Sequence, residues 1–313
     1  MAIDPNKKEG CLIGCVLSIV IFIAVIVGII ALCGLLMRGC AADSRSAADK
    51  ISALEPQDAK PADAVPEFKK VWSLGTGGKD APRIVRIPLE GVITGSTQRH
   101  GWFLDDDNTG AAAALDRIHA ATADKDIRGL LLEINSPGGE VTASDVLSDA
   151  VNRFRASGTN RFAVVLMGDL ACSGGYYVAA AADWIIARPT SWTGSIGVII
   201  PAVNAAALAQ KIGVTSVPVV SSGNKDLMDP LLPTNAAHVA ILQRAVDQAY
   251  DRFLDVVAKG RKMPKDLLRP LADGRVYTAP DALANRLIDQ IGYQEDALAK
   301  LADAGIFTGV MMM

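Results

Sequence analysis

The segment Ala171–Tyr177, which reads ACSGGYY, places a serine and two glycines at the junction of two expected elements. An apolar strand pattern ends at Met167, and a helix-like stretch begins near Ser173. A serine at the start of a helix lies beside backbone N–H groups that have no partner within the helix, and the helix dipole favours negative charge there. Glycines in this place let a substrate backbone approach, because no Cβ stands in the way. The pattern is typical of a nucleophile, although a serine that only caps a helix has the same local sequence.

A second segment, Asn135–Gly139, reads NSPGG and directly follows the apolar run Leu130–Ile134. Pro-Gly-Gly forms a tight turn whose glycines can expose backbone N–H groups. Such groups are what an oxyanion hole needs when a tetrahedral intermediate forms. Alone the segment is an ordinary turn, but together with a candidate nucleophile it indicates a hydrolase site.

A serine nucleophile also needs a base that accepts its proton. The chain has three histidines, and none lies near Ser173 in the sequence: His100, His119 and His238. His238 falls in the first turn of an expected amphipathic helix and is interpreted as a surface residue. Distance in the sequence does not exclude a Ser-His-Asp triad, but no histidine stands out as its base.

Lysine can replace histidine when its amine is neutral, which requires desolvation or nearby positive charge. Lys225 lies in the small-residue segment Ser221–Asp226, SSGNKD, directly after the apolar run Val217–Val220. By itself this lysine is interpreted as a solvated surface charge.

Five ordered motifs make the chain resemble peptidase family S49, the signal peptide peptidase A family. They are NSPGG at Asn135–Gly139, ACSGGYY at Ala171–Tyr177, TGSIGV at Thr193–Val198, SGNKD at Ser222–Asp226 and GRVY at Gly274–Tyr277. Ser195 lies 22 residues after Ser173, and Lys225 lies 52 residues after it, which fits the family's spacing. The resemblance covers roughly Ile84–Leu298, and five ordered motifs are far more specific than any one of them.

The resemblance implies a Ser-Lys mechanism without a cofactor or a metal ion. Ser173 attacks the scissile carbonyl, and Lys225 takes its proton and later delivers it to the leaving amine. Ser195 holds the lysine by a hydrogen bond, the orienting role that a third group supplies in other triads.

The resemblance also implies that backbone N–H groups hold the oxyanion. Gly174 supplies one of them, and the sequence leaves open whether Gly138 or Gly139 supplies the other. The chain departs from the family at one position, because Cys172 stands where a small residue such as alanine commonly precedes the nucleophile. A thiol is intrinsically the better nucleophile, but the family pattern aligns Ser173, so Cys172 is interpreted as a packing residue.

The elements around these motifs alternate between strands and helices. Strands are expected at Ile84–Leu89, Gly129–Ile134, Phe162–Met167 and Trp184–Ala187. Helices are expected at Ala111–Ala123, Ser144–Ala156, Ser173–Ala182, from a cap at Thr234 or Asn235 to Gly260, and at Pro280–Leu287. This rhythm predicts an α/β fold with mainly parallel strands. The resemblance specifies it as the spiral of ββα units found in crotonases and Clp proteases, in homo-oligomers whose neighbouring protomers complete an active site.

The N-terminal region differs in composition from the rest of the chain. Residues Cys11–Met37 carry no charged side chain. A helix of this length extends about 40 Å, enough to cross a hydrocarbon core of about 30 Å. The run is longer than the apolar part of a cleaved signal peptide, so we expect a single-pass membrane anchor. Lysine and arginine flank both ends, so charge does not decide its orientation; the resemblance places the catalytic domain outside the cytoplasm, on the periplasmic side.

The expected anchor and the family resemblance together define the rest of the chain's organisation. We expect a short tail at residues 1–10, a stalk at residues 38–82, the peptidase domain at residues 83–300 and a second tail at residues 301–313. The formal net charge of -3 argues against a nucleic-acid partner. A loop is expected at residues 95–110, with no role assigned to it.

The resemblance favours a membrane-anchored serine endopeptidase that cleaves remnant signal peptides or other membrane-associated peptides, in a groove for small or apolar side chains. Two other functions remain open. A crotonase-type acyl-CoA enzyme would use the same backbone N–H groups on a thioester, but it has no use for the pair Ser173 and Lys225 or for an anchor. An inactive membrane scaffold would bind peptides in the groove, but it has no use for a nucleophile with a base.

Overall fold

The computed structural model describes residues 70–73, 82–95, 109–306 and 310–312. All of them belong to one compact unit, Val65–Met313. The anchor expected at residues 11–37 and most of the loop expected at residues 95–110 lie outside the described residues. Within the described ranges, no helix combines the length and the hydropathy that a membrane span requires.

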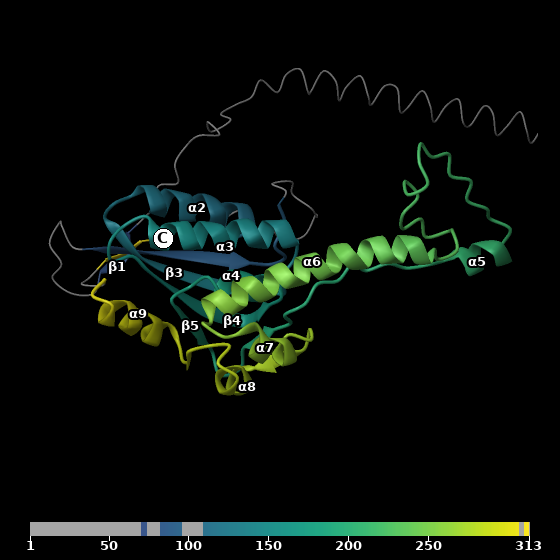
Figure 1. The fold of residues 1–313 in the computed structure, drawn as a ribbon. Helices are drawn as coiled ribbons and strands as arrows, with labels where there is room; N and C mark the ends of the chain where they lie inside the picture. The colour runs from purple at the N-terminus through teal and green to yellow at the C-terminus, as the bar shows by residue number, and fades with distance from the viewer. Residues whose placement is uncertain (1–69, 74–81, 96–108, 307–309, 313) are drawn as a thin grey trace, which may run out of the picture. The chain divides into compact units, whose positions relative to one another are not determined.

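A nine-stranded sheet forms the centre of the described unit (Figure 1). Its main path is β1-β9-β2-β3-β4-β5-β8, and β6 pairs with both β4 and β7 beside this path. The strands are β1 (Lys70–Ser73), β2 (Arg83–Glu90), β3 (Ile127–Ser136), β4 (Phe162–Cys172), β5 (Trp184–Ala187), β6 (Trp192–Gly194), β7 (Val276–Thr278), β8 (Gln290–Ile291) and β9 (Val310–Met312). The pairs β1–β9 and β6–β7 are antiparallel, and the others are parallel.

Helices cover both faces of this sheet. They are α2 (Ala111–Ala123), α3 (Val141–Ala156), α4 (Gly174–Ala179), α5 (Ala206–Lys211), α6 (Ala236–Gly260), α7 (Lys265–Leu268), the 3-10 turn η1 (Arg269–Leu271), α8 (Ala279–Ala284) and α9 (Gln294–Asp303). Figure 1 shows α2 and α3 side by side over one face of the sheet and α9 on the other side.

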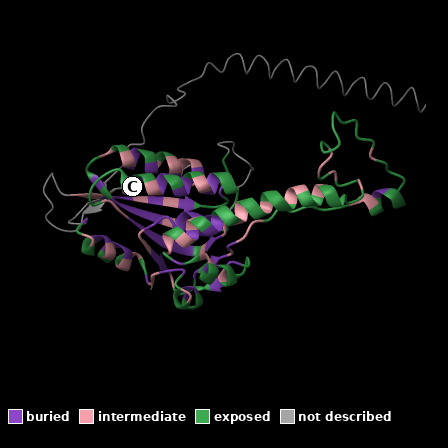
Figure 2. Ribbon diagram, viewed as in Figure 1, coloured by how far each residue is buried: buried purple, intermediate pink, exposed green. Residues whose placement is uncertain are grey.

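The two faces of the sheet bury separate apolar clusters, as the alternation of side chains along a strand requires. In β2, Val85 and Ile87 belong to the large cluster that includes residues of α2 and α3, whereas Ile84 belongs to a smaller cluster with Leu301 of α9. Figure 2 shows the central strands as the most buried part of the molecule. Burial on both faces explains why these strands read as continuous apolar runs.

Many elements match the sequence-based expectation. α2 and β5 have the predicted bounds, and α6 is capped by Asn235, whose Oδ1 accepts the N–H of Ala237 at 2.9 Å. β4 runs past the predicted end at Met167 and continues to Cys172, so this strand leads directly into Ser173. The mainly parallel sheet confirms the predicted α/β class and fits a crotonase-like fold.

Two strands at one end of the sheet lie in segments expected to have no strand. β1 falls within the residues assigned to the stalk, and β9 falls within those assigned to the C-terminal tail. They pair with each other, and β9 also pairs in parallel with β2. The sheet therefore includes backbone from both flanks of the expected peptidase domain.

Residues 199–242, which we call the arm, comprise α5, the loop that carries Lys225 and the first turns of α6. Four of its large apolar side chains are between 78% and 97% exposed: Ile199, Val203, Val217 and Val219. The buried residues of α6, in contrast, lie in its second half: Phe253, Leu254 and Val257. The arm thus has little packing within its own chain, and its exposed and half-buried residues are visible along α6 and α5 in Figure 2.

Candidate active site

Ser173 occupies a sharp turn between β4 and α4. Its backbone has φ 50° and ψ -119°, a conformation that residues other than glycine rarely adopt. The turn is held on both sides, because the N–H of Ser173 donates to the carbonyl of Gly194 at 2.8 Å and its carbonyl accepts the N–H of Tyr177 at 2.8 Å. Backbone strain of this kind costs about 1–3 kcal/mol and concentrates at functional sites, so the geometry supports a special role for Ser173.

Three glycines gather around Ser173, as the motifs predict. A Cβ placed on Gly138 would lie 2.8 Å from the Cβ of Ser173 and 2.7 Å from the nitrogen of Gly174. A Cβ placed on Gly174 would lie 3.1 Å from the nitrogen of Gly139. The NSPGG turn and the start of α4 are therefore in direct contact, although they lie more than thirty residues apart in the sequence.

The backbone N–H groups of these glycines differ in their partners. The N–H of Gly138 donates to the buried Oγ of Ser136 at 3.1 Å and is therefore already used. The N–H of Gly139 makes no hydrogen bond within the described residues, and neither does that of Gly174, the first residue of α4. Gly139 and Gly174 thus offer two free donors beside Ser173, a distinction that the sequence could not make.

Ser195 also lies at this site. Its preceding residue, Gly194, pairs with Cys172 in the parallel register of β4 and β6 and accepts the N–H of Ser173. Ser195 itself has φ 49°, and its N–H donates to the carbonyl of Arg275 at 2.8 Å. Two serines with positive φ therefore follow neighbouring strands at the same edge of the sheet.

Cys172 is buried just before the turn. Its Sγ lies 3.6 Å from the carbonyl oxygen of Trp192, and 7% of the residue is exposed. Burial raises the pKa of the Cys172 thiol, although a hydrogen bond with the backbone of Ala171 acts in the opposite direction. A buried, protonated thiol is a poor nucleophile, which supports the interpretation of Cys172 as a packing residue.

A small pocket opens beside Ser173. Its apolar walls include Val141 of α3, Val198 in the segment after β6, and Ala249 and Phe253 of α6. The ring of Tyr177 completes the wall, with its centroid 4.8 Å from that of Phe253. The phenol of Tyr177 donates to Asp145, and burial together with this hydrogen bond raises its pKa, so the group stays protonated.

Lys225 lies elsewhere in the chain. The carbonyl of Gly223 in its loop is 3.1 Å from Nε2 of His238, in the first turn of α6. The pocket at Ser173 is instead lined by Ala249 and Phe253, further along the same helix. Eleven residues of helix separate His238 from Ala249, and at 1.5 Å per residue this is about 16 Å. Within one chain, the structure does not bring Lys225 to Ser173.

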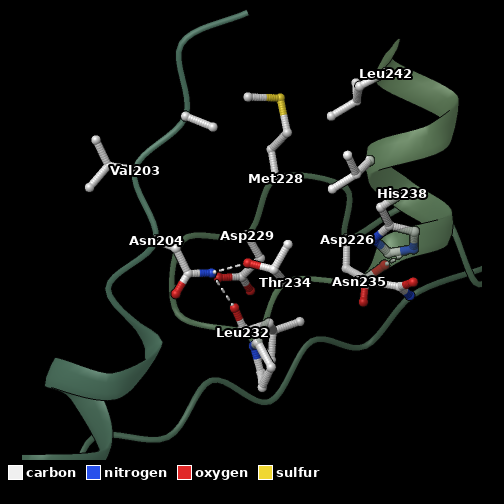
Figure 3. A pocket seen from close by; sticks show the side chains of 13 residues that line it. Val203, Asn204, Asp226, Met228, Asp229, Leu232, Thr234, Asn235, His238 and Leu242 are labelled. Atoms are coloured by element: carbon white, nitrogen blue, oxygen red, sulfur yellow. Dashed lines mark hydrogen bonds and ion pairs between the residues drawn. The ribbon is translucent and has the colours of Figure 1, made fainter. Parts of the chain in front are cut away.

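The loop of Lys225 borders a second, larger cavity, which we call the arm cavity (Figure 3). Its lining includes Val203, Asn204, Asp226, Met228, Leu232 and His238. The prediction that His238 is a plain surface residue is wrong, because 13% of its side chain is exposed and its ring contacts the loop of Lys225. Among the described residues, no histidine, lysine or carboxylate lines the pocket at Ser173.

The chain is similar to known peptidases. The model of "Peptidase family S49" matches residues 159–305, which include Ser173, Ser195 and Lys225. A Synechocystis sp. protein named as a protease is 30% identical to this chain over 230 residues, which cover 72% of this chain and 75% of that protein. The chain belongs to peptidase family S49, of the signal peptide peptidase A type.

Other S49-type relatives are longer than this chain. An Enterococcus faecium protein that carries the name signal peptide peptidase SppA is 37% identical over 224 residues, 72% of this chain and 64% of that protein. Protease 4 of Salmonella typhi is 33% identical over 233 residues, 74% of this chain and 36% of that protein. The chain thus spans less than two thirds of the length of these two S49 relatives.

Proposed function

We propose that this S49 chain is a membrane-anchored serine endopeptidase in which Ser173 is the nucleophile and Lys225 of a neighbouring copy is the general base. The observation that carries the proposal is the strained turn at Ser173 with two free backbone N–H groups beside it. Such an arrangement suits acyl transfer, because a tetrahedral intermediate needs donors aimed at its oxyanion.

The oxyanion hole of this proposal consists of the N–H groups of Gly139 and Gly174. Gly138 is assigned a different role, since its N–H is held by Ser136 and its lack of a Cβ lets the turn contact Ser173. During acylation Ser173 Oγ attacks the scissile carbonyl, its proton passes to the lysine, and the negative charge develops on the carbonyl oxygen between the two donors.

A base from a neighbouring copy would resolve the separation within one chain. Lys225 is exposed, and its loop is tied to the end of α6 that lies about 16 Å from the residues lining the pocket at Ser173. The arm also exposes more large apolar side chains than a soluble monomer usually tolerates. An arm that packs on the next copy would cover these side chains and deliver Lys225 to that copy's Ser173, where Ser195 would orient the amine.

The proposed substrates are remnant signal peptides or other membrane-associated peptides. The apolar pocket at Ser173 supports this class, since its walls of valine, alanine and aromatic rings favour small or apolar side chains. The anchor at residues 11–37 would hold the enzyme near such peptides, with the catalytic domain on the periplasmic side. Membership in a peptidase family argues against the acyl-CoA alternative.

The test uses the full chain in detergent and a quenched peptide rich in leucine and alanine. We expect Ser173→Ala and Lys225→Ala each to abolish cleavage without changing the assembly mass. Cleavage that survives in both variants would reject the mechanism, and binding of the peptide by the wild type without any cleavage would point to the inactive scaffold.

Mixing the two inactive variants tests the shared site. If Ser173 and Lys225 of one site come from different copies, co-expression restores about a quarter of the wild-type rate, the share of correctly matched neighbours at a random head-to-tail interface. If both residues of a site come from one copy, mixed assemblies stay inactive. Mass spectrometry of the mixed assemblies shows that both variants are present in each.

A further inference from the structure

Lys225 depends on its loop for its position. The N–H of Lys225 donates to the carbonyl of Ser222 at 3.1 Å, and its ammonium forms no hydrogen bond or ion pair within the described part of the chain. A long, exposed side chain without contacts is placed by the backbone that carries it. The groups that fix this backbone therefore decide where the proposed base can reach.

His238 touches this loop on both sides of Lys225. Its Nε2 lies 3.1 Å from the carbonyl oxygen of Gly223, two residues before the lysine, and 3.8 Å from Oδ1 of Asp226, the residue after it. Since a carbonyl only accepts hydrogen bonds, Nε2 must carry the proton in this contact. Figure 3 shows the imidazole and the Asp226 carboxylate facing each other at the edge of the arm cavity.

The backbone of His238 is held independently of the loop. The helix start is capped by Asn235, and Nδ2 of Asn204 donates to the carbonyl of Leu232 at 2.8 Å just before the cap (Figure 3). The imidazole thus projects from a fixed point, and 13% of its side chain is exposed. The imidazole of His238 therefore connects the loop of Lys225 to the start of α6.

The carboxylates of the loop differ in their partners. Asp229 accepts from the N–H of Leu231 and from Oγ of Ser216, each at 2.8 Å. Asp226 Oδ1 is buried and has no hydrogen-bond partner in the described residues. A buried carboxylate oxygen without a donor is costly. Nε2 of His238 lies 3.8 Å from this oxygen, and a small shift of the ring would let its N–H be shared between the two acceptors.

We propose that His238 is a positioning residue of the S49 reaction: its Nε2–H holds the Gly223 carbonyl and the Asp226 carboxylate and so places Lys225 for proton transfer. The inference rests on the proposed role of Lys225 as the base. His238 does not touch the substrate or Ser173 of its own chain; it acts only through the loop.

The experiment compares His238→Leu, which removes the donor, with His238→Gln, whose amide N–H can replace Nε2–H. A displaced base slows proton transfer but leaves the groove intact, so His238→Leu should lower kcat by about tenfold to hundredfold while KM stays nearly constant. His238→Gln should regain most of the loss, and Asp226→Asn should lower kcat less than His238→Leu. His119→Ala, an exposed histidine on α2, is the matched control and should keep the wild-type kcat.

Three results would overturn the proposal: an unchanged kcat in His238→Leu, a rise in KM that accounts for its loss of activity, or a glutamine variant as poor as the leucine variant. If His238→Leu fails to assemble, the comparison passes to His238→Asn, whose shorter amide cannot reach Gly223; equal rates for Gln and Asn would then overturn it. Ser173→Ala and Lys225→Ala are measured beside these variants. Cleavage that survives in them rejects the proposed function, whereas their inactivity with a normal His238→Leu rejects the positioning role alone.

Discussion

Gly138 lies directly against Ser173, with room for a hydrogen atom but not for a methyl group. A Cβ at Gly138 would come within 2.8 Å of the Cβ of Ser173, and the φ of Gly138 is 103°. The contact joins the turn after β3 to the turn after β4. The position of Ser173 over its two free donors therefore depends on the absence of a side chain at residue 138.

Gly138→Ala is expected to lower kcat by about 100-fold or more, because it displaces Ser173 from the oxyanion donors. The added methyl group and the unfavourable φ should also lower the free energy of unfolding by about 1–3 kcal/mol. Both effects are measured on the full chain, by peptide cleavage and by thermal unfolding.

Gly91→Ala is the matched control for this variant. Gly91 has φ 75°, but a Cβ placed there meets nothing within 4 Å. Its substitution should cost about 1 kcal/mol through the backbone alone and leave kcat unchanged. Equal losses of activity in the two alanine variants would show that backbone strain, and not the contact with Ser173, explains the effect.

Ser144 and Gly174 form a second close contact, which a double-mutant cycle can measure. A Cβ on Gly174 would lie 2.3 Å from Oγ of Ser144, whose hydroxyl donates to the carbonyl of Glu140 at 2.9 Å. We expect Gly174→Ala to destabilise the fold and Ser144→Ala to relieve part of that clash, with a coupling of about 1 kcal/mol in the free energy of unfolding. Additive effects would contradict the contact.

The same double variant should recover stability without recovering activity. The methyl group at residue 174 would still lie 3.1 Å from the nitrogen of Gly139, inside the space proposed for the oxyanion. A double variant with wild-type kcat would contradict the assignment of Gly139 and Gly174 as the donors.

The sequence predicted what depends on local pattern. The helix expected at Ala111–Ala123 has the bounds of α2, and the two glycine motifs indicated the contact between the NSPGG turn and Ser173. It could not choose between Gly138 and Gly139, because the choice depends on the single hydrogen bond from Gly138 to Ser136 Oγ. Sequence patterns do not specify which N–H group a nearby hydroxyl accepts.

The position of Lys225 relative to Ser173 could not be predicted from the sequence either. The motif identified the residue, but its distance from Ser173 is set by the length of α6 and by the contact between His238 and Gly223. The interpretation of His238 as a surface residue failed for the same reason, since the loop that covers it comes from residues 15 positions earlier. Periodicity within a helix gives no information about such a loop.

Cys172 provides a prediction about pH. Burial raises the pKa of its thiol above the ordinary value, so alkylation of the Cys172 peptide at pH 8 should be much slower in the folded chain than in urea. The folded state holds this proton more tightly than the unfolded chain does. The resulting stability is present below the unfolded thiol pKa of about 8.5 and is lost as the pH rises through the folded value. Quantitative mass spectrometry of the alkylated peptide measures the rate of Cys172 alkylation between pH 7 and pH 10, roughly the range in which an ordinary thiol titrates.

Cys172→Ala should therefore retain cleavage, since the thiol serves only for packing. The informative comparison is Ser173→Ala, which keeps Cys172. Residual cleavage in Ser173→Ala that disappears when Cys172→Ala is added would show that the thiol attacks the substrate, contrary to this prediction.

Val219 tests whether the arm is covered by another copy. Its side chain is 97% exposed within its own chain, so Val219→Glu removes almost no contact from the fold of a single copy. If the arm packs on a neighbour, the substitution buries an unpaired carboxylate there, which is costly. We expect a smaller assembly by mass photometry and loss of cleavage, because Lys225 no longer reaches the neighbour's Ser173. Ala302→Glu, at an exposed position of α9, should change neither the assembly mass nor the cleavage rate. An assembly of unchanged mass with full cleavage would show that Val219 is not buried between copies, and would remove the main structural support for a base supplied by a neighbouring chain.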